Sequence, residues 1–239
     1  MTFDPAPIGV LAPMPPELRP LVRRLRLRRP RGSPVHTGQL GGLAIVATTT
    51  GVGIERARRA TSRLIDQYRV RHVLVLGVAG GLDPSLAIGD VVVPEVVEAA
   101  DGTRYSASTL GGPVPSGCIL SDDQLVKDPA ALAGLRRRGV TALDMETAGV
   151  AEVCSARGVG WSAYRGISDQ ALDPSVDEAI LGLLRPDGSA DLGRVARLIG
   201  REPRRLASLV RLGRQLATAT GAAARTAAAA LGAAAAASS

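Results

Sequence analysis

Aromatic residues are scarce in this chain of 239 residues, with one Phe, one Trp and three Tyr. Hydrophobic residues nevertheless make up 46% of the sequence, which is enough for a sizeable core. That core must therefore be built from Val, Leu, Ile and Ala. The shortage also weighs against a nucleic-acid-binding protein, because such proteins commonly stack bases on aromatic side chains.

Cysteine and histidine are almost as rare, with two of each: Cys118, Cys154, His36 and His72. The cysteines form no CxxC pair, and both histidines are far from them in sequence, so we expect neither a disulfide framework nor a zinc site. This usage fits a reducing, cytoplasmic location. Prolines interrupt the N-terminal apolar stretch, which disfavours a secretory signal, and no apolar run is long enough to span a membrane.

Charge is unevenly distributed, with a formal net charge of +7 and arginine clusters at residues 23–29 and 136–138. Attraction to nucleic acid or to an anionic membrane surface is one interpretation. A solvated arginine-rich surface is the other, and we favour it because stacking residues are missing.

Strand and helix patterns alternate along the first part of the chain. Apolar, β-branched runs predict strands at residues 8–12, 43–47, 73–76, 91–97, 118–120 and 160–166. Helical patterns occur at residues 16–27, 54–68 and 144–157, the last ended by Gly158. This order predicts a three-layer α/β/α domain over residues 1–184, with a central, mostly parallel mixed sheet.

The composition changes after residue 184. A linker is expected at 185–190, followed by two basic amphipathic helices at about 191–200 and 203–219, which we group as an extension over 185–220. Such helices could lie on an anionic membrane as a peripheral contact, or pack their Leu face on the core or on a partner subunit; we favour packing. The Ala-rich end, 221–239, offers no apolar face, so we interpret it as a frayed tail.

Three stretches carry candidate chemistry. The glycine-rich residues 77–81 follow a buried strand, where they form either a tight turn or a loop that a ligand approaches closely. In the stretch LDMETAG, Asp144 and Glu146 either cap the start of a helix and interact with its dipole or, at Glu146, accept hydrogen bonds from ribose hydroxyls while Met145 packs on the sugar. In YRGISD, Asp169 is either a cap or a general acid whose pKa burial raises.

Taken together, the stretches GVAGGLDPSLAIGDVVV, DMETAGVAEVC and RGISDQA resemble the purine nucleoside phosphorylase and methylthioadenosine/adenosylhomocysteine nucleosidase family. The first strand from Ile8 and the acidic loop around Glu17 also match the family. The resemblance therefore extends from Ile8 to about Asp173. The resemblance implies cleavage of the N-glycosidic bond of a purine nucleoside, preferably one containing adenine, with no metal or organic cofactor. It also implies a homo-oligomer.

The resemblance further implies roles for single residues. Asp169 would protonate N7 of the leaving purine, and Glu17 would help to position the attacking water. Glu146 and Met145 would bind the ribose. The water or anion site and the base pocket would be formed by Arg165, Ala79, Gly80 and Ser168.

Two departures keep alternatives open. The segment between Val97 and Asp144 is short for the family and normally holds the base, so the substrate is not determined; Ser121, Asp122 and Gln124 are loose candidates for that task. The basic extension resembles longer members, including the hopanoid-associated branch, which acts on an adenosylated lipid.

Glu17 favours water over phosphate as the nucleophile, because a carboxylate repels phosphate. Phosphorolysis and a non-catalytic nucleoside-binding protein are the alternatives.

Overall fold

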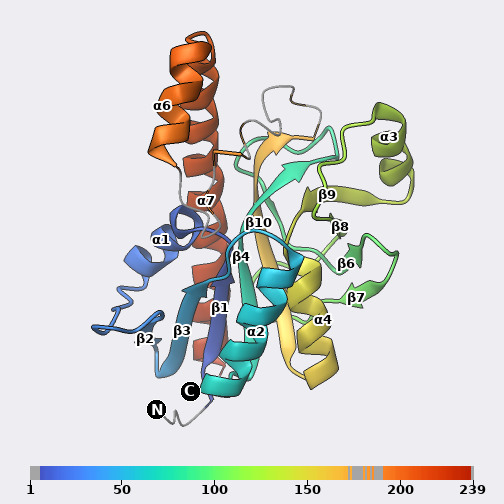
Figure 1. Ribbon diagram of the computed structural model, residues 1–239. Coiled ribbons are helices and arrows are strands. Elements are labelled where there is room, and N and C mark those ends of the chain that lie inside the picture. Colours follow the sequence, from blue (N-terminus) through green and yellow to red (C-terminus); the bar gives the residue numbers. More distant parts are fainter. Residues whose placement is uncertain are drawn as a thin grey trace.

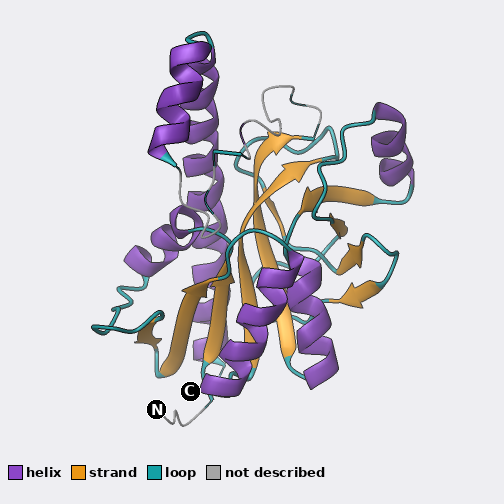
Figure 2. Ribbon diagram, viewed as in Figure 1, coloured by secondary structure: helices purple, strands orange, loops and turns teal. Residues whose placement is uncertain are grey.

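The computed structural model describes residues 6–171, 173, 180, 182, 183, 185 and 191–237. A twisted mixed sheet forms the central layer, and helices cover both of its faces (Figures 1 and 2). The three-layer α/β/α prediction is therefore confirmed. The expected domain boundary near residue 184 and most of the expected linker at 185–190 lie outside the described residues.

The strands of the sheet are β1 (Ile8–Ala12), β2 (His36–Leu40), β3 (Leu43–Thr49), β4 (His72–Gly81), β5 (Val91–Val92), β6 (Val96–Ala99), β7 (Arg104–Ser106), β8 (Cys118–Ser121), β9 (Val140–Asp144) and β10 (Gly160–Gln170). Their order is β2-β3-β1-β4-β9-β8-β6-β7, and β10 pairs with both β4 and β5. The pairs β1–β3, β1–β4, β4–β10, β6–β8 and β8–β9 are parallel. Strand β4 lies at the centre, between β1 and β10.

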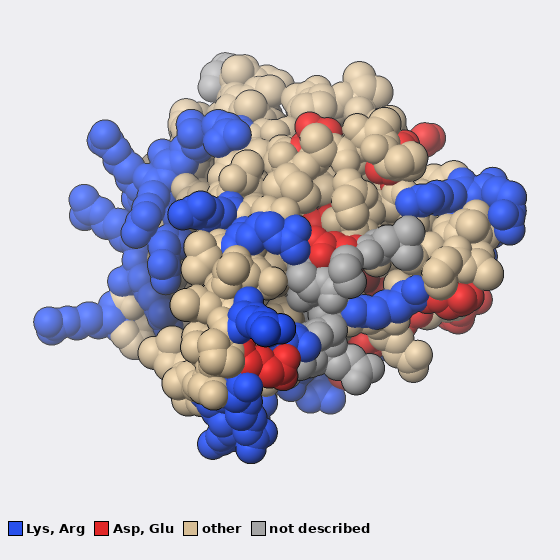
Figure 3. All heavy atoms as spheres, turned by 90° about the horizontal axis from the view of Figure 1, so that it is seen from above, with Lys and Arg blue, Asp and Glu red and all other residues tan. Residues whose placement is uncertain are grey.

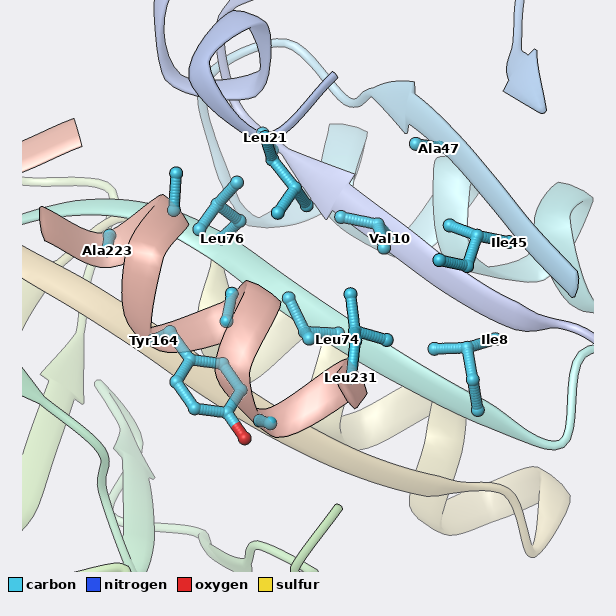
Figure 4. Close-up of a cluster of buried hydrophobic side chains, with 14 of the residues drawn as sticks. Ile8, Val10, Leu21, Ile45, Ala47, Leu74, Leu76, Tyr164, Ala223 and Leu231 are labelled. Carbon is cyan, nitrogen blue, oxygen red and sulfur yellow. The ribbon is translucent and has the colours of Figure 1, made fainter. Parts of the chain in front are cut away.

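The helices are α1 (Pro15–Arg24), α2 (Ile54–Tyr68), α3 (Pro129–Arg137), α4 (Thr147–Arg157), α6 (Leu192–Arg201) and α7 (Arg205–Ala236). Side chains alternate across β4 with the period of two that every strand has. Leu74 and Leu76 face the layer that contains α1 and α7, as Figure 4 shows, whereas Val73 and Val75 face α2 and α4. Each face thus has its own aliphatic core.

The Ala-rich end is not a frayed tail, and that interpretation is wrong. Residues up to Ala236 continue α7, and Ala223, Ala227 and Leu231 are fully buried in the core beside Tyr164 (Figure 4). Small side chains allow the helix to approach the sheet closely: a Cβ on Gly166 of β10 would lie 2.2 Å from the backbone oxygen of Ala219. A face made of alanine is thus a packing face.

Two local predictions near the expected site are also wrong. Residues 77–81 form no loop, because they pair with β10, and Gly80 and Gly81 pair with β9 as well. Asp144 ends β9 instead of starting a helix, and α4 begins three residues later. Strands β2, β7 and β9 and helix α3 were not predicted, because each is short or lies in a polar segment without clear periodicity.

Candidate active site

Arg165 of β10 is the centre of a buried polar network at one end of the sheet. Its guanidinium is fully buried and forms ion pairs with Asp144, at 2.6 Å, and with Glu146, at 3.3 Å. Nε and Nη2 of Arg165 also donate to the Thr147 hydroxyl, at 3.1 and 2.9 Å. A buried cation needs such partners, because water no longer solvates its charge.

Asp144 is held by hydroxyl groups as well as by Arg165. The hydroxyls of Ser121 and Thr147 donate to its two carboxylate oxygens. Backbone N–H groups of Glu146 and Thr147 donate to its Oδ1 at 3.3 Å, so the predicted capping role is present in part. The hydroxyl of Ser121 donates to Asp144 and accepts from Ala148 N. These two hydrogen bonds leave Ser121 unsuited to holding a base.

Glu17 lies buried in the first turn of α1, next to the same arginine. Its Oε2 accepts from Met14 N at 2.8 Å, and its Oε1 accepts from Val78 N at 2.9 Å, so the carboxylate connects α1 to β4. A Cβ on Gly77 would lie 2.2 Å from Nη1 of Arg165 and 2.7 Å from Oε1 of Glu17. Only glycine at this position lets both groups approach the strand.

Burial raises the pKa of two glutamates in the network. The pKa of Glu17 is about 7 and that of Glu146 about 8, because desolvation disfavours the charged forms and the attraction of Arg165 offsets it only in part. Glu146 Oε1 also accepts from Gly53 N at 3.2 Å, which joins α4 to the loop before α2. Carboxyl groups of this kind are characteristic of functional sites.

Asp169 lies near the end of β10, opposite Gly80 of β4. Its Oδ1 accepts a hydrogen bond of 2.6 Å from the Ser168 hydroxyl, and its Oδ2 would lie 3.5 Å from a Cβ on Gly80. Burial raises the pKa of Asp169, and the hydrogen bond from Ser168 opposes that rise. Ala79, which precedes Gly80 on β4 and pairs with Ile167, is buried.

Strand β4 sets the spacing between the two groups of carboxyls. Gly77 pairs with Arg165, and Gly80 pairs with Asp169. Three residues of a strand span about 10 Å. The structure thus brings Glu17 and Arg165 to one position along β4 and Asp169 and Ser168 to another, with the small residues Gly77, Ala79 and Gly80 forming the strand between them.

Met145 is half-buried beside the network and borders an open hollow of about 450 Å³. The hollow is lined by Val52, Gly53, Glu55, Arg56, Arg59, Asp123 and Met145. Because Gly53 also donates to Glu146, the hollow adjoins the carboxylate predicted to bind ribose. Among the described residues, no group of three or more His, Cys, Asp or Glu side chains is suited to holding a metal ion.

Sequence reasoning missed the support that Asp144, Ser121 and Thr147 give to Arg165. One signal was available: an arginine inside the apolar strand sequence of β10 must be neutralised by a nearby acid. Asp144 could have been proposed on that ground, but the two hydroxyl residues could not, because they meet only in the folded chain.

Comparison with known proteins identifies the family of this chain. The sequence profile of the phosphorylase superfamily matches residues 7–108 and 98–192. The chain belongs to the phosphorylase superfamily.

Two curated relatives of this superfamily member are 5'-methylthioadenosine/S-adenosylhomocysteine nucleosidases. The protein from Tolumonas auensis is 28% identical over 219 residues, which cover 77% of this chain and 95% of that protein. The protein from Halalkalibacterium halodurans is 30% identical over 166 residues, 57% of this chain and 72% of that protein. The profile match is divided near residues 98–108, at the start of the segment in which we expected a departure.

Solved structures show the same fold. The 5'-methylthioadenosine/S-adenosyl homocysteine nucleosidase of Helicobacter pylori, crystallised in complex with a substituted pyrrolidin-3-ol, has a TM-score of 0.70 at 21% identity, covering 93% of this superfamily member and 96% of that chain. The futalosine hydrolase of the same organism has a TM-score of 0.71 at 20% identity, covering 95% of this chain and 98% of that chain. At this level of identity, these similarities establish the fold.

Proposed function

We propose that this protein hydrolyses the N-glycosidic bond of an adenine nucleoside and releases the free base. The observation that carries the proposal is the arrangement along β4, with Asp169 at one position and Glu17 and Arg165 at another. Breaking the bond leaves negative charge on the purine and positive charge on the sugar. An acid at one end and carboxylates at the other stabilise both charges.

Asp169 takes the role of general acid toward N7. Its raised pKa favours the protonated carboxyl that can donate, and Ser168 holds its Oδ1 in place. Ala79 and Gly80 offer a narrow wall against which a flat base fits. Glu146 and Met145 bind the sugar from the side of the hollow, with Glu146 accepting from the ribose hydroxyls.

Water is the nucleophile best supported by the charges. Glu17, Asp144 and Glu146 surround Arg165, so three buried carboxylates face a single guanidinium. In their ionised forms these carboxyl groups would repel a phosphate dianion and attract a sugar cation. Nη1 of Arg165 is buried without a hydrogen-bond partner among the described residues and lies, with Glu17, next to Gly77. This pair of groups suits a water molecule.

The network also favours an enzyme over a non-catalytic binding protein. Buried carboxyl groups with raised pKa values cost stability, and a protein that only needed its fold would do better with apolar residues there. The relatives named as 5'-methylthioadenosine/S-adenosylhomocysteine nucleosidases support adenine as the base. A larger 5' substituent, such as the adenosylated lipid of the hopanoid-associated branch, and a homo-oligomeric assembly remain proposals from resemblance.

The test is a base-release assay with purified protein. Adenosine, methylthioadenosine, adenosylhomocysteine and inosine are incubated with and without phosphate, and free base and sugar products are separated by chromatography. We expect adenine and a free reducing sugar without phosphate, and little hypoxanthine. A strict phosphate requirement with a sugar 1-phosphate product would instead establish phosphorolysis, and no release from any substrate would contradict the proposal.

A further inference from the structure

Helix α6 and the first part of α7 form a hairpin, residues 191–216, which we call the basic hairpin. In Figure 1 it projects beyond the rest of the molecule, at the end of the sheet where β4 and β10 end. Helix α6 has no buried residue, and among the described helices and strands its main packing partner is α7. The basic hairpin is joined to the protein mainly through α7, with further hydrogen bonds from Asp191 N to Leu183 O and from Arg194 Nη1 to Gly182 O, and it does not complete the core.

Apolar side chains are exposed on this hairpin to an unusual degree. Leu192 is 76% exposed, Leu206 49% and Val210 46%. Elsewhere in the described part of the chain, Val114 is the one large hydrophobic residue with comparable exposure. Exposed leucine and valine side chains on one projecting element indicate a contact surface, because exposed apolar side chains on a protein surface are normally scattered singly.

Positive charge accompanies these apolar residues. The basic hairpin contains seven arginines and two acidic residues. Glu202 pairs with Arg205, and Asp191 lies near Arg194. Among the described residues, four exposed arginines of the hairpin have no ion-pair partner: Arg197, Arg201, Arg204 and Arg214. Figure 3 shows Lys and Arg side chains gathered along the left side of the molecule, where α1 and the hairpin lie in Figure 1.

We propose that the basic hairpin is a docking surface for an anionic lipid membrane. A strongly amphipathic helix with arginines and exposed aliphatic residues lies in the membrane interface, with its apolar side chains among the acyl chains and its cations at the headgroups. The guanidinium groups of the long arginine side chains can reach the headgroups while the methylene groups of the same side chains lie in the apolar region. Among the described residues no helix is long and apolar enough to cross a membrane, so the contact is peripheral.

A second copy of this chain and a nucleic acid are the two other possible occupants of the basic hairpin, and both fit it less well than a membrane. A second copy docked symmetrically through the hairpin would bring two positively charged surfaces together. Nucleic acid would use the arginines but would gain nothing from Leu206 and Val210, and the hairpin has no aromatic residue on which a base could stack. An anionic bilayer uses both features.

The hairpin also stands in a fixed relation to the candidate site. Arg211 of α7 pairs with Asp173, four residues after Asp169, at 3.4 Å. Farther along α7, Ala219 lies directly against Gly166, the neighbour of Arg165. A membrane bound by the hairpin therefore lies at the end of the sheet where Asp169 is placed.

The test measures partition of the full chain onto phosphatidylcholine vesicles with and without phosphatidylglycerol by co-sedimentation. We expect binding only to the anionic vesicles, weakened by high salt. Replacing Arg197, Arg201, Arg204 and Arg214 with Gln is expected to lower the partition coefficient at least about tenfold. Leu206→Ser combined with Val210→Ser is expected to weaken the binding that remains at high salt.

The matched control removes the same charge elsewhere, by replacing the exposed Arg31, Arg63, Arg104 and Arg137 with Gln. It is expected to keep most of the binding, and circular dichroism checks that every variant is folded. Equal losses in both quadruple variants would overturn the proposal, since net charge alone would then explain binding. So would absence of vesicle binding, a change of oligomeric mass in the hairpin variants, or a preference for DNA. Vesicle binding does not depend on catalysis, so this outcome is separate from that of the base-release assay.

Discussion

At the scale of single residues, the chemistry depends on which carboxyl groups are protonated. Asp169 is useful as an acid only while it holds its proton, and burial raises its pKa toward that state. Glu17 and Glu146 share one cation, so their protons are coupled and belong to the network as a whole. The positive charge of Arg165 lowers both pKa values and so offsets part of the effect of burial.

Asp169→Asn tests the acid directly. The amide has a similar shape but cannot transfer a proton to N7, so kcat is expected to fall about 100-fold or more while the substrate still binds. Steady-state kinetics on the best substrate of the base-release assay measure the effect. Asp101→Asn is the control, because Asp101 is exposed on a turn where it accepts from Thr103 N and takes no part in the network. Undiminished kcat in Asp169→Asn would remove the acid from the mechanism.

At the scale of elements, the contact of α7 with β10 is what turns an alanine-rich helix into part of the core. Alanine brings little apolar area per residue, so the helix gains its stability from close approach over many turns. Gly166 permits that approach at Ala219. The same contact anchors the hairpin and supports the strand that carries Arg165 and Asp169.

Gly166→Ala is expected to destabilise the protein. The new methyl group would meet the backbone oxygen of Ala219, and moving a helix backbone is costlier than moving a flexible side chain. We expect a loss of about 1–3 kcal/mol in the free energy of unfolding, measured by urea denaturation. Gly213→Ala is the matched control in the same helix, because nothing lies within 4 Å of its added Cβ. That change should be neutral or stabilising, since alanine favours helix. Equal stability of the two variants would show that α7 is not tightly packed on β10.

At the scale of the whole molecule, the buried carboxyls predict how stability depends on pH. Glu17 has an ordinary pKa of 4.5 and a folded-state pKa of about 7. Between these values the unfolded chain gives up a proton that the folded chain retains, so raising the pH favours unfolding. The stabilisation is fully present below pH 4.5 and is lost as the pH rises through about 7.

We therefore expect Tm to fall between pH 5 and pH 8, and Glu17→Gln to reduce that fall because glutamine does not titrate. Each 1 kcal/mol corresponds to about 2–4 °C in a chain of this size. Differential scanning calorimetry across the pH range measures the effect. Glu95→Gln changes an exposed glutamate and should follow the unmodified protein. A steeper fall in Glu17→Gln than in the unmodified protein would contradict the assigned pKa.

Local pattern was enough to predict the layered α/β architecture, because long apolar strands and amphipathic helices such as Ile54–Tyr68 are determined by neighbouring residues. The candidate residues Glu17, Glu146, Arg165 and Asp169 could likewise be selected from motifs. Short or polar elements such as β9 and α3 could not, since their stability comes from neighbours far away in sequence.

Only the tertiary structure decided what surrounds those residues. Residues 77–81 form a strand because β9 and β10 supply partners for their backbone groups. Asp144 and Arg165, 2.6 Å apart, meet because β9 and β10 both pair with β4. The alanine-rich end, which has no amphipathic pattern of its own, became core because Gly166 left room for it. Contacts between distant segments are invisible to local periodicity, and in this protein they determine both the charge of the site and the last layer of the fold.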